Sequence, residues 1–145
     1  MGKRDKIAFG IYFLLALSSV AFGVVYLFCS TIMPYHRVAI GIPWEQLSSG
    51  LQALLQGLIK VAAAGFLVTG ISFLALLIIP FRRGDLWAKW LIPILGSVWN
   101  IIALYATIMI AMKTPAVTPW PAAIAAMVLL IIAFILAPGF GKSAN

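Results

Sequence analysis

The sequence predicts an all-α integral membrane protein built as a four-helix bundle, and three observations lead to this prediction. Four long stretches contain no Lys, Arg, Asp or Glu, and they enclose 30, 21, 23 and 28 residues. A membrane-spanning helix needs about 20 apolar residues. Of all residues, 64% are hydrophobic and 9% are charged, whereas a soluble domain carries roughly 25% charged residues. The mean hydropathy is +1.13. One bundle accounts for the length, so we expect a single transmembrane domain over residues 1–145.

The uncharged stretches place four spans at about residues 7–29, 58–80, 90–112 and 120–138. The apolar run that opens the first span is longer than the usual 7–15 residues of a signal peptide, so we expect this span to be retained. Residues 31–42 are predicted to form a loop, and residues 81–85 a tight basic turn. Pro93 and Pro121 fit first helical turns, where a missing N–H costs little. Pro138 and Gly139 are expected to end the fourth span.

The distribution of Lys and Arg predicts the orientation. With four spans, the N-terminus, the turn 81–85 and the C-terminus share one side of the membrane. That side carries seven basic residues: Lys3, Arg4, Lys6, Arg82, Arg83, Lys89 and Lys142. The other side carries three: Arg37, Lys60 and Lys113. The positive-inside rule therefore places both termini in the cytoplasm and the protein in a cell inner membrane.

The net charge of +7 indicates that the basic residues bind an anionic partner. They gather in small groups beside the apolar spans, and they do not form the stripe that a nucleic-acid footprint requires. We therefore expect the lipid bilayer, with its anionic headgroups, as their partner and no nucleic acid.

Residues 44–60 have a different pattern from the four spans. Apolar side chains follow helical spacing, and polar side chains form a column at steps of four, three, four and four. The column consists of Glu45, Ser49, Gln52, Gln56 and Lys60. The pattern predicts an amphipathic helix of about four turns, starting after Pro43 at the outer side and leading directly into span 2.

Two interpretations of this segment stay open. Its helix either lies in the outer interface with the polar column in water, or continues into span 2 and turns the column towards the bundle. In the second case Gln56 and Lys60 line an outward-facing polar cavity together with Asn100 or Thr107. The candidate ligand-binding residues are Gln52, Gln56, Lys60, Asn100, His36 and Glu45. An alternative for Asn100 is an interhelical hydrogen bond.

Residues for catalysis are scarce. His36 and Glu45 are the only acid–base pair expected outside the membrane, and such a pair can move protons. Together with Cys29 they do not provide the usual ligand set of a zinc site. Cys29 is also the one cysteine, so it has no partner for a disulfide within the chain. We therefore assign no catalytic residue, no metal and no cofactor.

Small residues indicate which helix faces pack. In span 3 they recur at helical spacing, and similar faces occur in spans 1 and 4. The faces are Ala16, Ser19 and Gly23 in span 1, Gly96, Asn100, Ala103, Thr107 and Ala111 in span 3, and Ala122, Ala126, Ala133 and Ala137 in span 4.

Three segments together resemble a group of small bacterial four-span inner-membrane proteins that are DoxX-like in overall plan. The segments are Met33-Pro34-Tyr35-His36, residues 80–88 (PFRRGDLWA) and Pro119-Trp120-Pro121-Ala122. The resemblance implies a four-helix fold in a bacterial inner membrane, and it implies no activity.

The leading functional hypothesis is a non-enzymatic membrane protein that acts through helix packing, as an accessory subunit of other membrane proteins or as a homo-oligomer. The alternative is a binder or carrier of a small apolar ligand in an outward-facing cavity lined by span 2. A membrane enzyme that uses His36 and Glu45 is the second alternative.

Overall fold

The structure is a computed structural model that describes residues 2–137, and all regular structure within them is helical. The helices are α1 (Lys3–Phe28), α2 (Pro34–Ile40), α3 (Ser49–Leu76), α4 (Leu86–Lys113) and α5 (Trp120–Leu136), with a 3-10 turn η1 (Trp44–Gln46) and a π turn η2 (Leu77–Phe81). The predicted all-α class is confirmed. The predicted stop at Pro138 and Gly139, and the cation Lys142, lie outside the described residues.

Within residues 2–137, three helical segments are long and apolar enough to cross a membrane. They are Lys3–Phe28 with 26 residues, Ser49–Phe81 with 33 and Leu86–Lys113 with 28. The helix Trp120–Leu136 is also apolar but has only 17 residues. The predicted membrane character is therefore supported by composition and by helix length together.

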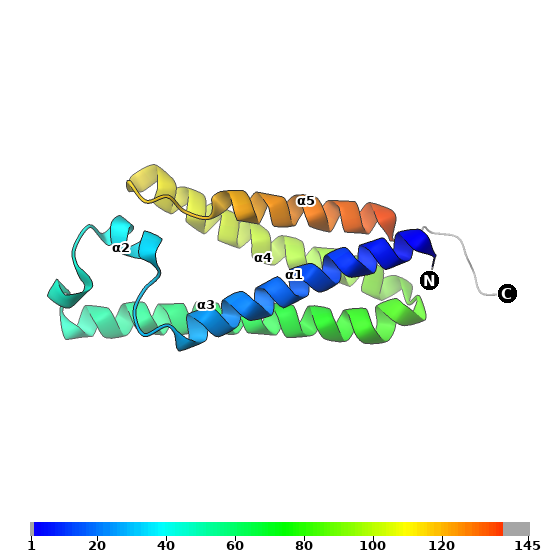
Figure 1. Ribbon diagram of the computed structural model, residues 1–145, viewed down its shortest axis with the longest axis horizontal. Coiled ribbons are helices and arrows are strands. Elements are labelled where there is room, and N and C mark those ends of the chain that lie inside the picture. The colour runs from blue at the N-terminus through cyan, green and yellow to red at the C-terminus, as the bar shows by residue number, and fades with distance from the viewer. Residues whose placement is uncertain (1, 138–145) are drawn as a thin grey trace.

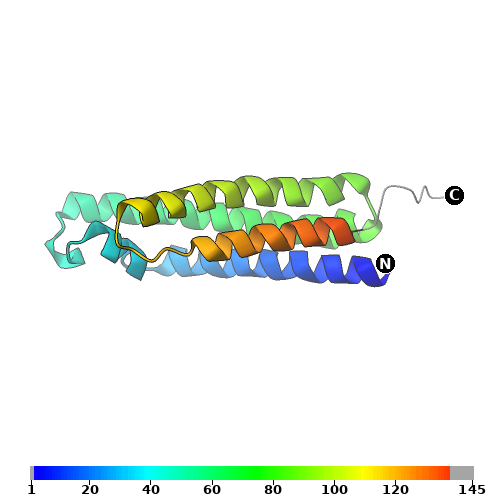
Figure 2. The same cartoon turned by 90° about the horizontal axis from the view of Figure 1, so that it is seen from above.

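The four longest helices lie side by side along the long axis of the molecule (Figures 1 and 2). The start of α1 and the turn between α3 and α4 lie at one end, which we call the turn end. The helix α2 lies at the opposite end, called the α2 end (Figure 1). α1 lies at an angle to α3 and α5 (Figure 1). It packs on α5 near the turn end and on α3 towards the α2 end.

Residues 31–42 contain a helix that the sequence prediction missed. α2 begins with Pro34 at its first position and ends at Gly41, whose φ of 71° is left-handed. Proline at the start and glycine just past the end are the ordinary boundaries of a helix. The predicted loop is therefore wrong over residues 34–40, because Pro34 and Gly41 mark the two ends of a helix of seven residues.

The amphipathic segment also begins differently from the prediction. The expected helix starting after Pro43 is wrong, because only the turn Trp44–Gln46 forms there and the long helix starts at Ser49. The Ser48 hydroxyl accepts a hydrogen bond from the Leu51 N–H at 3.3 Å, and serine is among the strongest N-cap residues. From Ser49 onwards the helix continues without interruption into the predicted second span.

The crossing of α1 and α3 depends on glycines that leave no room for a side chain. A Cβ atom built on Gly70 lies 2.9 Å from the Ala16 carbonyl oxygen and 2.9 Å from the Val20 backbone nitrogen. A Cβ atom on Gly23 lies 2.7 Å from the Leu67 side chain. The predicted small-residue face of span 1 therefore lies in this contact, where backbones approach closely.

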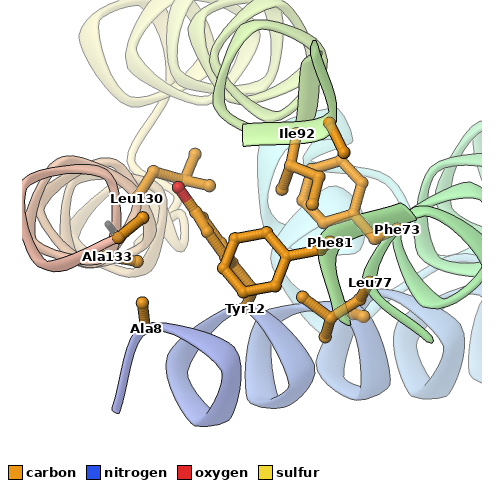
Figure 3. Packing of buried hydrophobic residues seen from close by; sticks show 11 residues of the cluster. Ala8, Tyr12, Phe73, Leu77, Phe81, Ile92, Leu130 and Ala133 are labelled. Atoms are coloured by element: carbon orange, nitrogen blue, oxygen red, sulfur yellow. The ribbon is translucent and has the colours of Figure 1, made fainter. Parts of the chain in front are cut away.

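The largest buried cluster lies near the turn end and joins all four long helices (Figure 3). Tyr12 is fully buried, and its ring meets Phe81 edge-on at 5.9 Å between centroids. Its hydroxyl points towards Leu130 and has no hydrogen-bond partner among the described residues. Phe81 ends the π turn, in which Pro80 has no N–H to donate to the preceding helix. Gly84, with a φ of 84°, then reverses the chain into α4.

Substitution of Gly70 by alanine tests the helix crossing. Gly70→Ala should lower the thermal unfolding temperature of the protein in detergent micelles, with a loss of about 1–3 kcal/mol, because backbone atoms of α1 have to move. Gly57→Ala is the matched control on the same helix, since no atom lies within 4 Å of its added Cβ. This control should be neutral or stabilising, and an equal loss in both variants would contradict the close crossing.

Candidate functional site

The predicted polar column lies where α3 passes the end of α1. The last carbonyl groups of any helix lack partners within that helix. At the end of α1, side chains of α3 donate hydrogen bonds to such carbonyls. We call this arrangement the α1 cap, and it consists of Gln56, Lys60 and the carbonyl groups that they contact in residues 26–30.

Lys60 is the centre of the α1 cap. Its ammonium nitrogen lies 2.6 Å from the Leu27 carbonyl oxygen, 2.7 Å from that of Cys29 and 3.4 Å from that of Tyr26. An ammonium group has three N–H donors, so these three carbonyls satisfy it completely. The C-terminal end of a helix also carries partial negative charge. The cation is therefore stabilised by backbone dipoles, without a contacting carboxylate.

Two glutamines extend the same pattern along α3. The Gln56 amide donates to the Ser30 carbonyl. The Gln52 amide donates to the Trp44 carbonyl at 2.8 Å and to the Leu47 carbonyl at 3.3 Å, which ties η1 to α3. The two outer members of the column, Glu45 and Ser49, are exposed. Its inner three members bind the backbone of the segments that precede α3.

Side chains of α2 and of the loop before it complete this end of the molecule. The hydroxyls of Tyr26 and Tyr35 lie 3.0 Å apart. Arg37 donates to the Thr31 hydroxyl at 2.8 Å and to the Ile32 carbonyl at 3.4 Å. These contacts hold α2 against the end of α1, beside the α1 cap.

The structure does not bring the proposed acid–base pair together. His36 is half-buried in α2 beside the Tyr35 ring, with 4.0 Å between ring centroids, whereas Glu45 is exposed in η1. Within residues 2–137 no hydrogen bond or ion pair joins them. Burial lowers the pKa of His36 below its ordinary value of 6.5, so its imidazole is neutral at pH 7. Burial, together with the bond to Tyr26, raises the pKa of Tyr35.

Asn100 makes its hydrogen bond within α4, so the expected interhelical bond is not found. Its amide donates to the Gly96 carbonyl at 2.8 Å, one helical turn earlier. The Thr107 hydroxyl likewise bonds to the Ala103 carbonyl at 2.9 Å. One interhelical hydrogen bond that the sequence did not predict is made by Ser19, whose hydroxyl donates to the Phe66 carbonyl of α3 at 2.8 Å. Ser19 was recognised only as a small residue.

The part of α4 that follows Gly96 is sparsely covered. The buried residues of α4 are Ala88, Lys89, Ile92 and Gly96, all in its first half. Beyond them no residue of the helix is buried, and Tyr105 and Met112 are 70% and 82% exposed. The main contact of this region with α3 is Trp99, whose ring meets Phe66 at 4.9 Å between centroids. The predicted face of Asn100, Ala103, Thr107 and Ala111 is therefore half-buried.

Within the described part of the chain no group of three His, Cys, Asp or Glu side chains could hold a metal ion. The side chains of Ser19, Gln56, Lys60, Asn100 and Thr107 donate their hydrogen bonds to backbone carbonyls. These bonds join helices and loops to one another or bond a side chain to its own helix. Any additional ligand-binding role of the six candidate residues stays a prediction.

Comparisons with protein-family models, with curated proteins and with solved structures each found no match to this chain. The DoxX-like resemblance therefore stays a prediction.

Removal of the Lys60 ammonium tests the α1 cap. Lys60→Met should destabilise the protein in micelles by about 1.5–3 kcal/mol, because three carbonyl groups lose a charged donor. Lys60→Arg should restore part of the lost stability, since arginine keeps the positive charge. The restoration is only partial because its donors lie in one plane. The control is Lys113→Met, which removes an exposed cation at the end of α4 and should have little effect. Equal stability of Lys60→Met and the unchanged protein would refute the cap.

Proposed function

We propose that this chain is a four-span protein of a bacterial cell inner membrane, with both termini in the cytoplasm. In this proposal it acts without catalysis, as an accessory subunit or homo-oligomeric scaffold that associates through helix packing. The observation that carries the proposal is the sparsely covered second half of α4, in which no residue is buried.

The four-span topology is supported by the long helices and their exposed side chains. A helix of 17 residues lies at the lower limit for crossing a membrane, so α5 can form the fourth span. The outer surfaces of the long helices carry exposed apolar side chains such as Phe28 (78%), Val61 (71%) and Ile135 (72%). A soluble protein rarely exposes such a continuous apolar surface, whereas lipid solvates it.

The orientation is supported by the charges at the two ends. Among the described residues, six basic side chains belong to the turn end: Lys3, Arg4, Lys6, Arg82, Arg83 and Lys89. Three belong to the α2 side: Arg37, Lys60 and Lys113. The positive-inside rule then places the turn end in the cytoplasm. Exposed Trp87 and Trp90 fit the inner interface, and Trp120 fits the outer one.

Association through α4 is supported by the residues on its sparsely covered half. The side chains of Ala103 and Ala111 are small, and those of Asn100 and Thr107 are bonded to their own helix. Such a face lets the backbone of a second transmembrane helix approach closely, and packing drives helix association in lipid. We therefore infer that a transmembrane helix of another subunit, or of a second copy, packs against residues 97–113.

A ligand carrier is the second candidate, and one observation favours it. The side-chain oxygen of Asn100 accepts no hydrogen bond from residues 2–137, although Asn100 lies half-buried on this face of α4. A small apolar ligand with one donor group would suit that position. The ligand would then lie against this part of α4.

Accessibility of single cysteines tests the topology. In a background with Cys29→Ser, Val38→Cys should react with a membrane-impermeant maleimide in intact cells, because Val38 is exposed on α2. Arg83→Cys should react only after permeabilisation, since the turn end faces the cytoplasm in this proposal. The opposite pattern would overturn the orientation, and labelling of both positions in intact cells would contradict four spans.

Native mass spectrometry after gentle extraction from the native membrane tests the association. We expect a complex with defined subunits or a homo-oligomer, and Ala103→Phe should dissociate it because the bulky ring keeps a partner helix from the face. Ala125→Phe, on the exposed side of α5, is the matched control and should leave the complex intact. A monomer that carries one small molecule of fixed mass would favour the ligand carrier, and a bare monomer would contradict both functions.

A further inference from the structure

The turn end carries a cluster of basic side chains that have no partners within residues 2–137. Lys3, Arg4 and Lys6 lie in the first turn of α1, and Arg82 and Arg83 lie between η2 and α4. All five are exposed, and none makes a hydrogen bond or an ion pair within residues 2–137. They form what we call the basic cluster.

Packing of aromatic rings brings the two halves of the basic cluster to the same place. Phe9 lies one turn after Lys6 on α1, and its ring lies 6.4 Å from that of Phe81 between centroids. Arg82 follows Phe81 directly in the chain. The turn after Arg82 is fixed by backbone hydrogen bonds, with the Asp85 N–H donating to the Pro80 carbonyl at 3.0 Å. The cations therefore belong to two rigidly connected groups, one on α1 and one on the α3–α4 turn.

The acidic residues nearby do not neutralise this cluster. Asp5 accepts a hydrogen bond from the Gly2 backbone N–H at 2.8 Å and so caps the start of α1. Asp85 stands just before α4, and its side chain makes no cap hydrogen bond there. Five cations thus face two carboxylates, and the excess of positive charge favours an anionic partner.

We propose that the basic cluster binds the headgroup of a membrane lipid with two phosphates, with one phosphate at the first turn of α1 and the other at Arg82 and Arg83. The inference rests on the proposed topology, which places the turn end at the cytoplasmic leaflet. Guanidinium groups bind phosphate oxygens in a bidentate manner. A lipid with two linked phosphates binds more tightly when both phosphates occupy their sites at once, because the second binding step is intramolecular. Two separate lipids lack this gain in affinity.

The apolar surroundings of the basic cluster suit the chains of the same lipid. Ile7 on α1 is 45% exposed, and Ile79 and Leu86 on either side of the α3–α4 turn are both 52% exposed. These side chains lie within about one helical turn of the cations along the sequence. A lipid can therefore place its headgroup on the cations and its acyl chains on the adjacent apolar side chains, as basic sites at the cytoplasmic ends of spanning helices do.

Lipid exchange in nanodiscs tests this inference. The protein is placed in phosphatidylcholine nanodiscs that contain either cardiolipin or phosphatidylglycerol at equal total phosphate. Native mass spectrometry then counts the retained lipids, and unfolding temperature is the second readout. We expect retention of one cardiolipin, bound on the order of tenfold more tightly per phosphate than phosphatidylglycerol, and a higher unfolding temperature.

Two double variants and a control locate the site. Arg82→Gln with Arg83→Gln should remove the preference for cardiolipin, because one phosphate loses both of its cations. Lys3→Gln with Lys6→Gln should weaken the preference, because only Arg4 remains at the other phosphate. Lys113→Gln at the other end of α4 should keep the preference. Equal binding of both lipids at equal phosphate, or an equal loss in the control, would overturn the inference. Failure of the protein to enter nanodiscs would instead count against the proposed membrane topology.

Discussion

The close crossing of α1 and α3 is the constraint on which the rest of the structure depends. Gly70 puts the two backbones in direct contact, and Gly23 admits the Leu67 side chain. The Ser19 hydroxyl bonds to the Phe66 carbonyl at the same interface, so the two helices are fixed in register as well as in distance. In lipid, where apolar burial drives little association, such packing and hydrogen bonding provide the specificity.

The α1 cap is a consequence of this register. Once the two helices cross at Gly70, Lys60 lies beside the last carbonyls of α1, and one turn earlier Gln56 reaches Ser30. An unsatisfied carbonyl costs several kcal/mol away from water, so the end of a spanning helix needs donors close to the hydrocarbon region. Lys60 provides them, and its charge is favoured by the partial negative charge of the helix end. The register of the pair thus decides where α1 can stop.

The sequence predicted the elements better than their contacts. Gaps between charged residues marked the long helices, because charge is excluded from apolar spans, and Ala16, Ser19 and Gly23 marked the packing face of α1. α2 was missed because a helix of seven residues has too few turns to show a period. The partners of Lys60 could not be predicted, since they are backbone carbonyls, which every residue carries. The partner of Asn100 could not be predicted for the same reason, because it is the Gly96 carbonyl of its own helix.

The two ends of the molecule differ in how completely they are packed. At the turn end, Tyr12, Phe81, Ile92 and Leu130 bury side chains from all four long helices in one cluster. At the α2 end, the second cluster contains residues of α1, α3 and the segment between them, and it contains none from α4 or α5. The pair of α4 and α5 is therefore anchored near the turn end, and α4 is joined to α3 further along mainly through Trp99. The turn end thus joins all four long helices, whereas the α2 end joins α1, α3 and the segment between them.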